Sequence, residues 1–417
     1  MERVILHSDL NNFYASVECL YNPDIRDKPI AVCGSQSTRH GIVLAKNYIA
    51  KKYNIKTGEA IGEAKKKCPN LVIVKPNYLL YLKFSKLAID IYKRYTDLIE
   101  PFGIDECWLD MTNSTRLFGD GVEIAFKIKE RIREELGITA SIGVSYNKIF
   151  AKLGSDMKKP DAVTVITEEN FKSTVWPLAV DNLMYVGRST KVKLNRAGIF
   201  SIGDLARTTP SFLIRQLGKW GEMLWVFANG YDDNTVEKVE YEPIIKGIGN
   251  SLTTPRDLTC SEDIKILFYV LSDSVAQRLR RHNLKGKTIQ ISIRGSDMET
   301  IERQGQLPYY TSISTEIAEK SLEIFLKSWD WSKNIRLLGI RVTNLVMADS
   351  YIQLSFFEND RRTKKQLLES SVDKIRSRYE HYSVQRALLL KDSSLNANPS
   401  EENVIHPVPY FRQGDIL

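Results

Sequence analysis

The stretch Phe102-Gly103-Ile104-Asp105-Glu106-Cys107-Trp108-Leu109-Asp110 sets two adjacent carboxylates between apolar residues that are typical of buried strands. Carboxylates are seldom buried without a cation, because the removal of a charge from water is costly. We therefore expect Asp105 and Glu106 to serve a bound cation.

A second acid, Asp9, follows the apolar run Val4-Ile5-Leu6. Acids that two strands deliver to one place suit a pair of hard divalent cations with oxygen ligands. The alternative is that Asp9 caps a helix that begins near Asn11, and that Asp105 and Glu106 are turn residues of a hairpin. The occurrence of both features in one chain favours the metal site.

The composition is that of a soluble globular chain with a basic excess. The 417 residues are too many for one compact core and predict two to four domains. Hydrophobic residues make up 43% of the chain and charged residues 26%. The 59 Lys and Arg residues outnumber the 51 acids, and the net charge of +8 favours a polyanionic partner without identifying it.

The cysteines and the hydropathy bear on location. The five cysteines are scattered without CxxC spacing, which disfavours a zinc site and favours a reduced, intracellular chain. The sequence holds no apolar run long enough to span a bilayer, and its first residues resemble a core strand rather than a signal peptide. We therefore expect a cytoplasmic protein without membrane contact.

The order of apolar patterns predicts a mixed α/β fold. Strands are expected at residues 3–9, 29–33, 41–44, 71–74 and 139–145, with a hairpin at 98–111 that carries the acid pair. Helices are expected from Asn11 to before Pro23 and at residues 47–53, 59–67, 78–96 and 121–136. The main sheet should be mostly antiparallel, with helices on one face.

The rest of the chain changes character several times. Residues 167–234 are expected to be helical, residues 235–243 a linker, and residues 244–345 to follow the order strand, helix, two strands, helix, strand. Leu368, Val372, Ile375 and Tyr379 recur at spacings of 4, 3 and 4, which predicts a short amphipathic helix. The polar stretch from Lys391 to the end is expected to be mobile.

Three segments together resemble the signature segments of the Y-family translesion DNA polymerases, in their bacterial lesion-bypass branch. They are His7-Ser8-Asp9-Leu10-Asn11-Asn12-Phe13-Tyr14-Ala15-Ser16-Val17-Glu18, Ile104-Asp105-Glu106 and Ser145-Tyr146-Asn147-Lys148-Ile149-Phe150-Ala151-Lys152. The match spans residues 1–357. It implies a polymerase right hand of the α/β (α+β) class, with a ferredoxin-like palm (1–10 and 77–166), small fingers (11–76), a helical thumb (167–234), a linker (235–243) and an α+β little finger (244–346). The tail, residues 347–417, would carry a clamp-binding peptide and the short amphipathic helix.

The resemblance implies a low-fidelity DNA polymerase without proofreading, active in DNA repair, damage tolerance and the SOS response. Such an enzyme, a mutator and a monomer, adds deoxynucleotides from their triphosphates to the 3′ end of a primer on primer-template DNA. Two Mg²⁺ ions, with Mn²⁺ as a possible substitute, would activate the attacking hydroxyl and neutralise the leaving pyrophosphate.

The resemblance also implies which residues hold the ions. Asp9 and Asp105 would bridge both, Glu106 would hold the catalytic one, and the carbonyl of Leu10 would add a ligand. Because strand side chains alternate between faces, Asp105 and Glu106 can converge only where the backbone departs from a regular strand.

Five side chains near the acids are candidates for nucleotide binding: Phe13, Tyr14, Tyr48, Lys51 and Lys159. The family assigns Tyr14 as a steric gate against a 2′-hydroxyl, with a core aromatic as the alternative, while Phe13 is expected to pack. Tyr48, Lys51 and Lys159 match the positions that hold the triphosphate, with solvated lysines as the alternative. The family usually has Arg at the position of Lys51. The ammonium of Lys51 is a point charge, whereas a guanidinium binds phosphate as a fork, so we expect the triphosphate to be oriented less firmly.

Lys148 and Lys152 belong to the third signature segment. They are four residues apart and would share one helical face. A role beside the triphosphate and a solvated surface position both remain open for them.

Two regions are candidates for DNA contacts. Tyr185-Val186-Gly187-Arg188-Ser189-Thr190 resembles a helix-hairpin-helix turn, which offers backbone amides to a phosphate. Tyr185 stands where the family has glycine, and a plain helical hairpin is the alternative. In residues 244–346 the candidates are Arg278, Arg280, Arg281, Arg294, Arg336 and Arg341. One face of the sheet there should be polar and basic, with an ordinary half-exposed sheet as the alternative.

Gln353-Leu354-Ser355-Phe356-Phe357 resembles the peptide by which bacterial polymerases dock on the sliding clamp. Two aromatic side chains in a polar tail suit anchors for a partner's pocket, and packing on the chain's own domain is the alternative.

Two rival functions are a nucleotidyl cyclase, which has no use for the thumb and the basic final domain, and a DNA-binding adaptor without catalysis. The intact Asp9, Asp105 and Glu106 argue against the adaptor.

Overall fold

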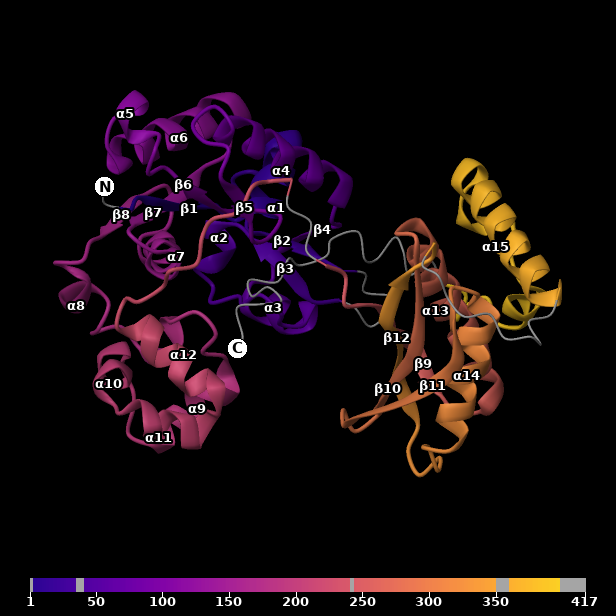
Figure 1. The fold of residues 1–417 in the computed structure, drawn as a ribbon. Coiled ribbons are helices and arrows are strands. Elements are labelled where there is room, and N and C mark those ends of the chain that lie inside the picture. Colours follow the sequence, from indigo (N-terminus) through magenta and orange to yellow (C-terminus); the bar gives the residue numbers. More distant parts are fainter. Residues whose placement is uncertain (1–2, 35–40, 241–243, 350–359, 398–417) are drawn as a thin grey trace. The chain divides into compact units, whose positions relative to one another are not determined.

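The computed structural model describes residues 3–34, 41–240, 244–349 and 360–397. They form two compact units, one mainly within residues 1–243 and the other mainly within residues 244–406 (Figure 1). In the described ranges no helix is both long and apolar enough to cross a membrane. The mixed α/β class expected from the sequence is confirmed.

A five-stranded sheet forms the centre of the first unit. Its order is β5 (Ile99–Pro101), β6 (Glu106–Asp110), β1 (Ile5–Leu10), β7 (Ala140–Ser145) and β8 (Val163–Ile166). All neighbours are antiparallel except β7 and β8, which are parallel. β1 is therefore a central strand between β6 and β7, and its six residues are all buried.

Helices cover both faces of this sheet, so the expectation of helices on one face is wrong. α4 (Tyr78–Tyr92) and α6 (Gly121–Leu136) pack against Leu6 and Leu109 on one face. α7 (Lys148–Met157) packs against Ile5 and Trp108 on the other. The approach of α7 depends on Gly143 of β7, since a Cβ there would lie 1.9 Å from the carbonyl oxygen of Ala151.

Two smaller regions complete the first unit. β2 (Ile30–Cys33), β3 (Val43–Lys46) and β4 (Val72–Val74) form a three-stranded sheet that accompanies α1 (Phe13–Tyr21), α2 (Tyr48–Lys51) and α3 (Ile61–Lys67). α9 (Arg188–Arg196), α10 (Ile202–Arg207), α11 (Pro210–Leu217) and α12 (Lys219–Ala228) form a helical region. Both regions have the element types that the sequence predicts.

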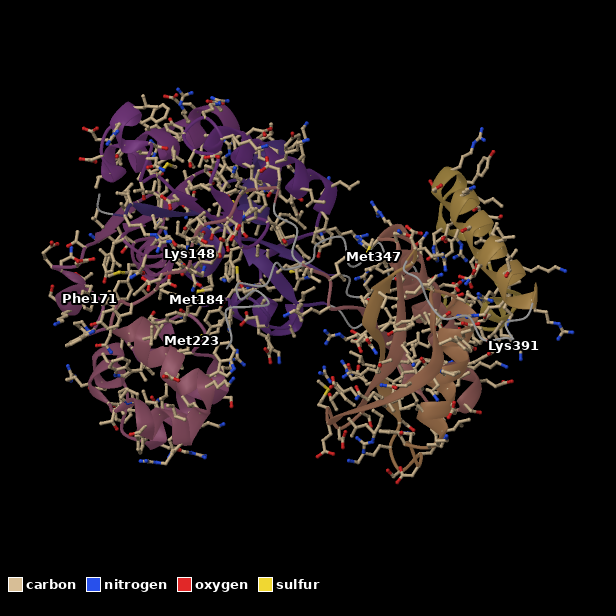
Figure 2. The ribbon with its side chains drawn as sticks, viewed as in Figure 1. Lys148, Phe171, Met184, Met223, Met347 and Lys391 are labelled. Carbon is tan, nitrogen blue, oxygen red and sulfur yellow. The ribbon has the colours of Figure 1, made fainter. Side chains whose placement is uncertain are left out.

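The segment expected to be a linker is attached to the first unit over its first residues. The ammonium of Lys148, which is 2% exposed, donates to the carboxylate of Glu100 at 2.8 Å and to the carbonyl of Thr235 at 3.3 Å. The backbone N–H of Glu237 donates to Glu100 at 3.1 Å, and Val236 between them is buried. Figure 2 shows Lys148 in the interior of this unit.

The second unit is a four-stranded antiparallel sheet with two helices on one face. The strand order is β11 (Thr300–Thr311), β10 (Leu284–Gly295), β12 (Ile335–Met347) and β9 (Gly247–Leu258). Ile289, Ile291 and Ile293 of β10 join a core with α13 (Ser261–Arg281) and α14 (Ser314–Leu326). The alternate residues Gln290, Ser292 and Arg294 are half-buried on the opposite, polar face.

The C-terminal segment differs from two expectations. The expected helix is present as α15 (Asp360–Tyr379), but it is long, with 20 residues. Of its apolar stripe, Leu368, Ile375 and Tyr379 are exposed and Val372 is half-buried. Residues 392–397, the described part of the stretch expected to be mobile, are attached to the fold, and the rest of that stretch lies outside the described residues. Leu395 is fully buried in the core of the second unit, together with Leu389 from η4 (Ala387–Lys391). Leu395 is an apolar residue in a polar stretch, so the hydropathy of the sequence does not predict this contact.

Leu395→Ala is expected to destabilise the second unit by about 2 to 5 kcal/mol, because it leaves a cavity in a closed core. The matched control is Leu390→Ala, which removes a side chain that is 75% exposed and should change the free energy of unfolding by no more than about 0.5 kcal/mol. Urea denaturation of both variants measures the difference. Equal, small effects would show that residues 392–397 do not pack.

Candidate active site

Strand pairing brings the three acids of the sequence motifs together. In the antiparallel pair of β1 and β6, Asp9 lies directly opposite Glu106. The backbone N–H of Leu10 donates to the carbonyl of Asp105 at 3.0 Å, which ties the residue before β6 to the end of β1. Asp105 lies in a bend outside the strand, so the backbone has the departure from regular geometry that adjacent acids need in order to converge.

Helix α7 and the turn after it place two ammonium groups on these acids. Lys152 donates to a carboxylate oxygen of Glu106 at 2.6 Å, and Lys159 donates to Asp9 at 2.6 Å. Lys159 also lies 2.8 Å from Asp156. Lys152 is therefore at the acid cluster, while Lys148 is held by Glu100, and neither is the solvated surface lysine of the alternative interpretation.

Burial sets the acidity of the carboxylates. The pKa of Asp9 is raised to about 7, mainly by removal from water. The ammonium of Lys159 opposes this rise, and the negative charges of Glu106 and Asp105 add to it. Burial, and then the charge of Glu106, raise the pKa of Asp105 to about 6. A cluster of this kind gains stability from any cation that enters it.

The donor set fits divalent cations in chemistry, although the side chains do not form a ready-made cage. In the part of the chain that the structure describes, no three His, Cys, Asp or Glu side chains converge closely enough to hold a metal ion as they lie. Lys152 and Lys159 draw Glu106 and Asp9 to themselves, so rotation of those carboxylates is needed. All three groups are hard oxygen donors, which Mg²⁺ prefers.

His7 lies at the site but is not predicted from the sequence, because a residue within a buried strand looks like an ordinary core residue. Its ring is fully buried, with Nδ1 2.8 Å from the hydroxyl oxygen of Ser155 and Nε2 3.7 Å from a carboxylate oxygen of Glu106. Burial and the nearby charges of Lys152 and Lys159 lower the pKa of His7 well below its usual value, which keeps the ring neutral. Nε2 has no hydrogen-bond partner among the described residues, so a polar position stays open toward Glu106.

An aromatic cluster stands beside the acids. The ring of Tyr14 stacks on Tyr81, with centroids 4.3 Å apart and planes at 9°, and meets Tyr78 edge-on. Tyr81 is fully buried and donates its hydroxyl to Glu18. Burial, and then the charge of Asp105, raise the pKa of Tyr14 to about 12, which places the phenol near that acid. Phe13 is 2% exposed and packs in the core, as expected.

The three expected triphosphate residues are linked by contacts and charges, with Lys159 bonded to Asp9 of the cluster. Burial raises the pKa of Tyr48. The charge of Lys159 lowers this pKa and the charge of Asp9 raises it, so both groups act on the Tyr48 phenol. The ammonium of Lys51 lies 5.5 Å from the centre of the Tyr48 ring. Lys51 is exposed, whereas Tyr48 and Lys159 are half-buried.

The expected hairpin has open space for a ligand at its turn. Gly187 is the N-cap of α9, and a Cβ at this position would meet no atom within 4 Å. Gly187, Arg188 and Ser189 are all exposed. Tyr185 has φ +71°, the left-handed conformation that glycine adopts most easily, and its ring packs on Trp220 at 5.6 Å. The backbone therefore keeps a glycine-like turn despite the substitution.

The arginines of the second unit divide into two groups. Arg341 lies opposite Gln290 in the strand register, and Arg294 donates to Thr300, both on the polar side of the sheet. Arg280 instead binds Glu369 and Asp373 of α15, and Arg278 donates to the carbonyl of Gly249 at 3.0 Å. Arg278 and Arg280 lie on α13 rather than on the polar face of the sheet, so we propose no DNA contact for them. Arg281 is exposed at the end of the same helix, and Arg336 is half-buried on β12.

The expected clamp-binding peptide Gln353-Leu354-Ser355-Phe356-Phe357 lies outside the described residues. The chain enters it after β12 and leaves it at the start of α15. Its role rests on the sequence resemblance alone.

Comparisons with known proteins agree with these features. Residues 8–156 match the impB/mucB/samB family, and residues 245–356 match the impB/mucB/samB family C-terminal domain. The chain is 63% identical over 397 residues to the DNA polymerase IV of Acetivibrio thermocellus, with 95% of this chain and 100% of that one covered. It is 38% identical to the DNA polymerase IV of Clostridium acetobutylicum, with 94% and 99% covered. Among solved structures it is similar to the Y-family DNA polymerase chimera Dbh-Dpo4(243-245)-Dbh, with a TM-score of 0.72 and 26% identity over 82% of this chain and 99% of that one.

Asp105→Asn is expected to stabilise the metal-free protein in mildly alkaline buffer. Burial raises the pKa of Asp105 from 3.8 to about 6 on folding, so this group makes folding less favourable as the pH rises through that interval, whereas Asn is indifferent to pH. Urea denaturation with a chelator present should show a gain in unfolding free energy that is smallest below pH 3.8 and reaches a plateau above about pH 6. A gain that does not vary with pH would contradict the assigned burial of this charge.

Proposed function

The chain belongs to the Y-family DNA polymerases, and from that premise we propose that it extends a primer by two-metal phosphoryl transfer at Asp9, Asp105 and Glu106. It is a DNA-directed DNA polymerase of the group that carries out translesion synthesis. The observation that carries the mechanistic proposal is the pairing of β1 with β6, which sets Asp9 opposite Glu106 and joins Asp105 to Leu10. Low fidelity, the lack of proofreading and a part in the SOS response are further parts of the proposal.

Asp9, Asp105 and Glu106, together with the Leu10 carbonyl, would hold two Mg²⁺ ions, with Glu106 serving the catalytic one. Such ions, when bound, activate the 3′-hydroxyl and offset the charge of the leaving pyrophosphate, and Mn²⁺ supplies the same chemistry. The chain's own part is to fix the backbone of the three acids through the pairing of β1 with β6, so that only the Asp9 and Glu106 side chains must rotate away from Lys159 and Lys152 when ions bind. We propose that residues 1–10 and 77–166 form the palm, 11–76 the fingers, 167–234 the thumb and 244–346 the little finger.

Lys159, Tyr48 and Lys51 would bind the triphosphate of the incoming nucleotide. Lys159 lies against Asp9, and Tyr48 feels the charges of both. Release of Lys159 from Asp9 would turn its ammonium toward the phosphates. Lys51 supplies a point charge rather than a planar fork, so its contribution is mainly electrostatic.

Tyr14 would exclude ribonucleotides by occupying the space of a 2′-hydroxyl. Its ring cannot easily retreat, because Tyr81 stacks on one face and is itself fixed by Glu18. A gate of this kind selects by steric clash rather than by a bond.

Primer-template DNA would contact the turn at Gly187, Arg188 and Ser189 and the polar sheet face of the second unit, with Arg294, Arg336 and Arg341 as its cations. Backbone amides and basic side chains of this type bind phosphates without regard to sequence. The segment Gln353–Phe357 would dock on the sliding clamp and keep a monomeric, cytoplasmic enzyme at the primer end by raising its effective concentration there.

Asp105→Ala and Glu106→Ala, made separately, should abolish Mg²⁺-dependent primer extension and leave affinity for primer-template within a few fold. The carboxylates serve the chemistry, whereas most DNA affinity comes from phosphate contacts. The matched control is Asp110→Ala, which removes an acid from the far end of the same strand β6 and should retain activity. Near-normal extension by either active-site variant would falsify the two-metal assignment.

Tyr14→Ala should raise the incorporation of ribonucleotides strongly and reduce the use of deoxynucleotides less, because removal of the ring removes a clash. Tyr21→Ala, an exposed tyrosine at the end of the same helix α1, is the control. Single-nucleotide insertion kinetics with both sugars give the ratio. If the ratio stays at the wild-type value, another group guards the 2′ position.

A further inference from the structure

Helix α15 packs with its charged side inward. Arg280 of α13 donates to Asp373 at 2.6 Å and to Glu369, which is 9% exposed. At the N-terminal end of α15, Arg362 donates to Glu316 of α14 at 3.1 Å and to the carbonyl of Tyr310 at 2.6 Å. α15 is thus attached along its length to the two helices of the second unit.

Two further ion pairs hold the other end of α15 and the chain beyond it. Arg376 lies 3.4 Å from Asp273 of α13, and Arg386 reaches the same carboxylate at 3.2 Å. Arg386 also donates to the hydroxyl of Ser314 at 2.6 Å. With Leu389 and Leu395 in the core, the segment is attached to the second unit by apolar contacts as well as by ion pairs.

The outward side of α15 is apolar and cationic. Leu367, Leu368, Ile375 and Tyr379 are 63%, 64%, 40% and 60% exposed. The exposed cations of the helix are Arg361, Lys364, Lys365, Lys374 and Arg378. The two acids in the interior of the helix, Glu369 and Asp373, both face inward to Arg280. Exposed apolar side chains at helical spacing, ringed by one sign of charge, are typical of a docking surface.

The position of this surface in the chain restricts its occupant. Phe357 of the proposed clamp-binding peptide is three residues before Asp360, so a partner that holds Phe357 has the first turn of α15 within about 11 Å. α15 packs on α13 and α14, which cover the apolar face of the sheet (Figure 1). The DNA contacts proposed for this unit are on its polar face instead. A second copy of the chain would present the same cations and repel the first.

We propose that the outward face of α15 is a second docking surface for the partner that takes residues 353–357, and that it fits an acidic, partly apolar surface beside that partner's peptide pocket. The proposal rests on the proposed function, since it takes the sliding clamp as that partner. Two linked contacts strengthen each other, because the second forms at the high effective concentration that the first creates.

The test measures the affinity of the full chain for the purified sliding clamp of the same organism, by surface plasmon resonance. Leu368→Ser with Ile375→Ser should weaken binding about tenfold, since such side chains would be anchors. Lys364→Glu with Lys374→Glu should also weaken binding and make it less dependent on salt, because the cations would face acids. Leu390→Ser, another exposed leucine of the same segment, should bind as wild type. All three variants should keep the wild-type melting temperature, because the altered side chains are exposed.

Wild-type affinity of the Leu368→Ser, Ile375→Ser variant would overturn the proposal. So would a loss of binding to phosphatidylserine vesicles or to duplex DNA while clamp binding is intact, because the face would then serve a membrane or nucleic acid. Leu354→Ala with Phe356→Ala tests the peptide separately, and primer extension by the wild-type chain without clamp tests the polymerase. Failure of the α15 surface is therefore distinguishable from failure of either part of the proposed function.

Discussion

The antiparallel pairing of β1 with β6 is the constraint on which the rest of the site depends. It sets Asp9 opposite Glu106 and brings Asp105 to the end of β1, in the interior of a sheet covered on both faces. Burial opposes the charges that the chemistry needs, and it raises the pKa of Asp9 and Asp105. α7 offsets this cost with Lys152, and Gly143 lets that helix approach the strands closely enough to do so. The fold thus stabilises an arrangement of like charges that favours the entry of cations.

Local patterns were enough to predict most elements and the acids themselves. Asp105 and Glu106 stand out because carboxylates are unusual in an apolar run, and the bend before β6 is the departure that two adjacent acids require. The partners of those acids were not predictable in the same way. Lys148 and Lys152 share one helical face, yet one is buried against Glu100 and the other reaches Glu106. Which acid each lysine meets depends on how α7 crosses the sheet, and the spacing of the two lysines does not show this. His7 and Tyr81 were missed because each reads as an ordinary core residue and acts through a neighbour distant in sequence.

The C-terminal segment is a second case in which the sequence predicts an element but not its neighbours. Hydrophobic spacing predicts an amphipathic helix, but ion pairs from Arg280 and Arg362 bind its charged side, and Leu368 and Ile375 stay exposed. Periodicity identifies a helix and its faces, and it does not say which face a neighbour covers when that neighbour carries complementary charges. Arg280 was assigned to DNA for the same reason, since an arginine on a helix does not reveal a carboxylate 93 residues away. The apolar residues that remain exposed on α15 are the basis of the proposed second docking surface.

The most direct test of the central claim is a count of bound ions. Mn²⁺ titration followed by electron paramagnetic resonance, with primer-template and a non-hydrolysable nucleotide present, should give two ions for each wild-type chain, and fewer for Glu106→Gln while DNA remains bound. The same ion count in both proteins, or a single ion in the wild type, would contradict the assignment of Asp9, Asp105 and Glu106 as a two-metal site.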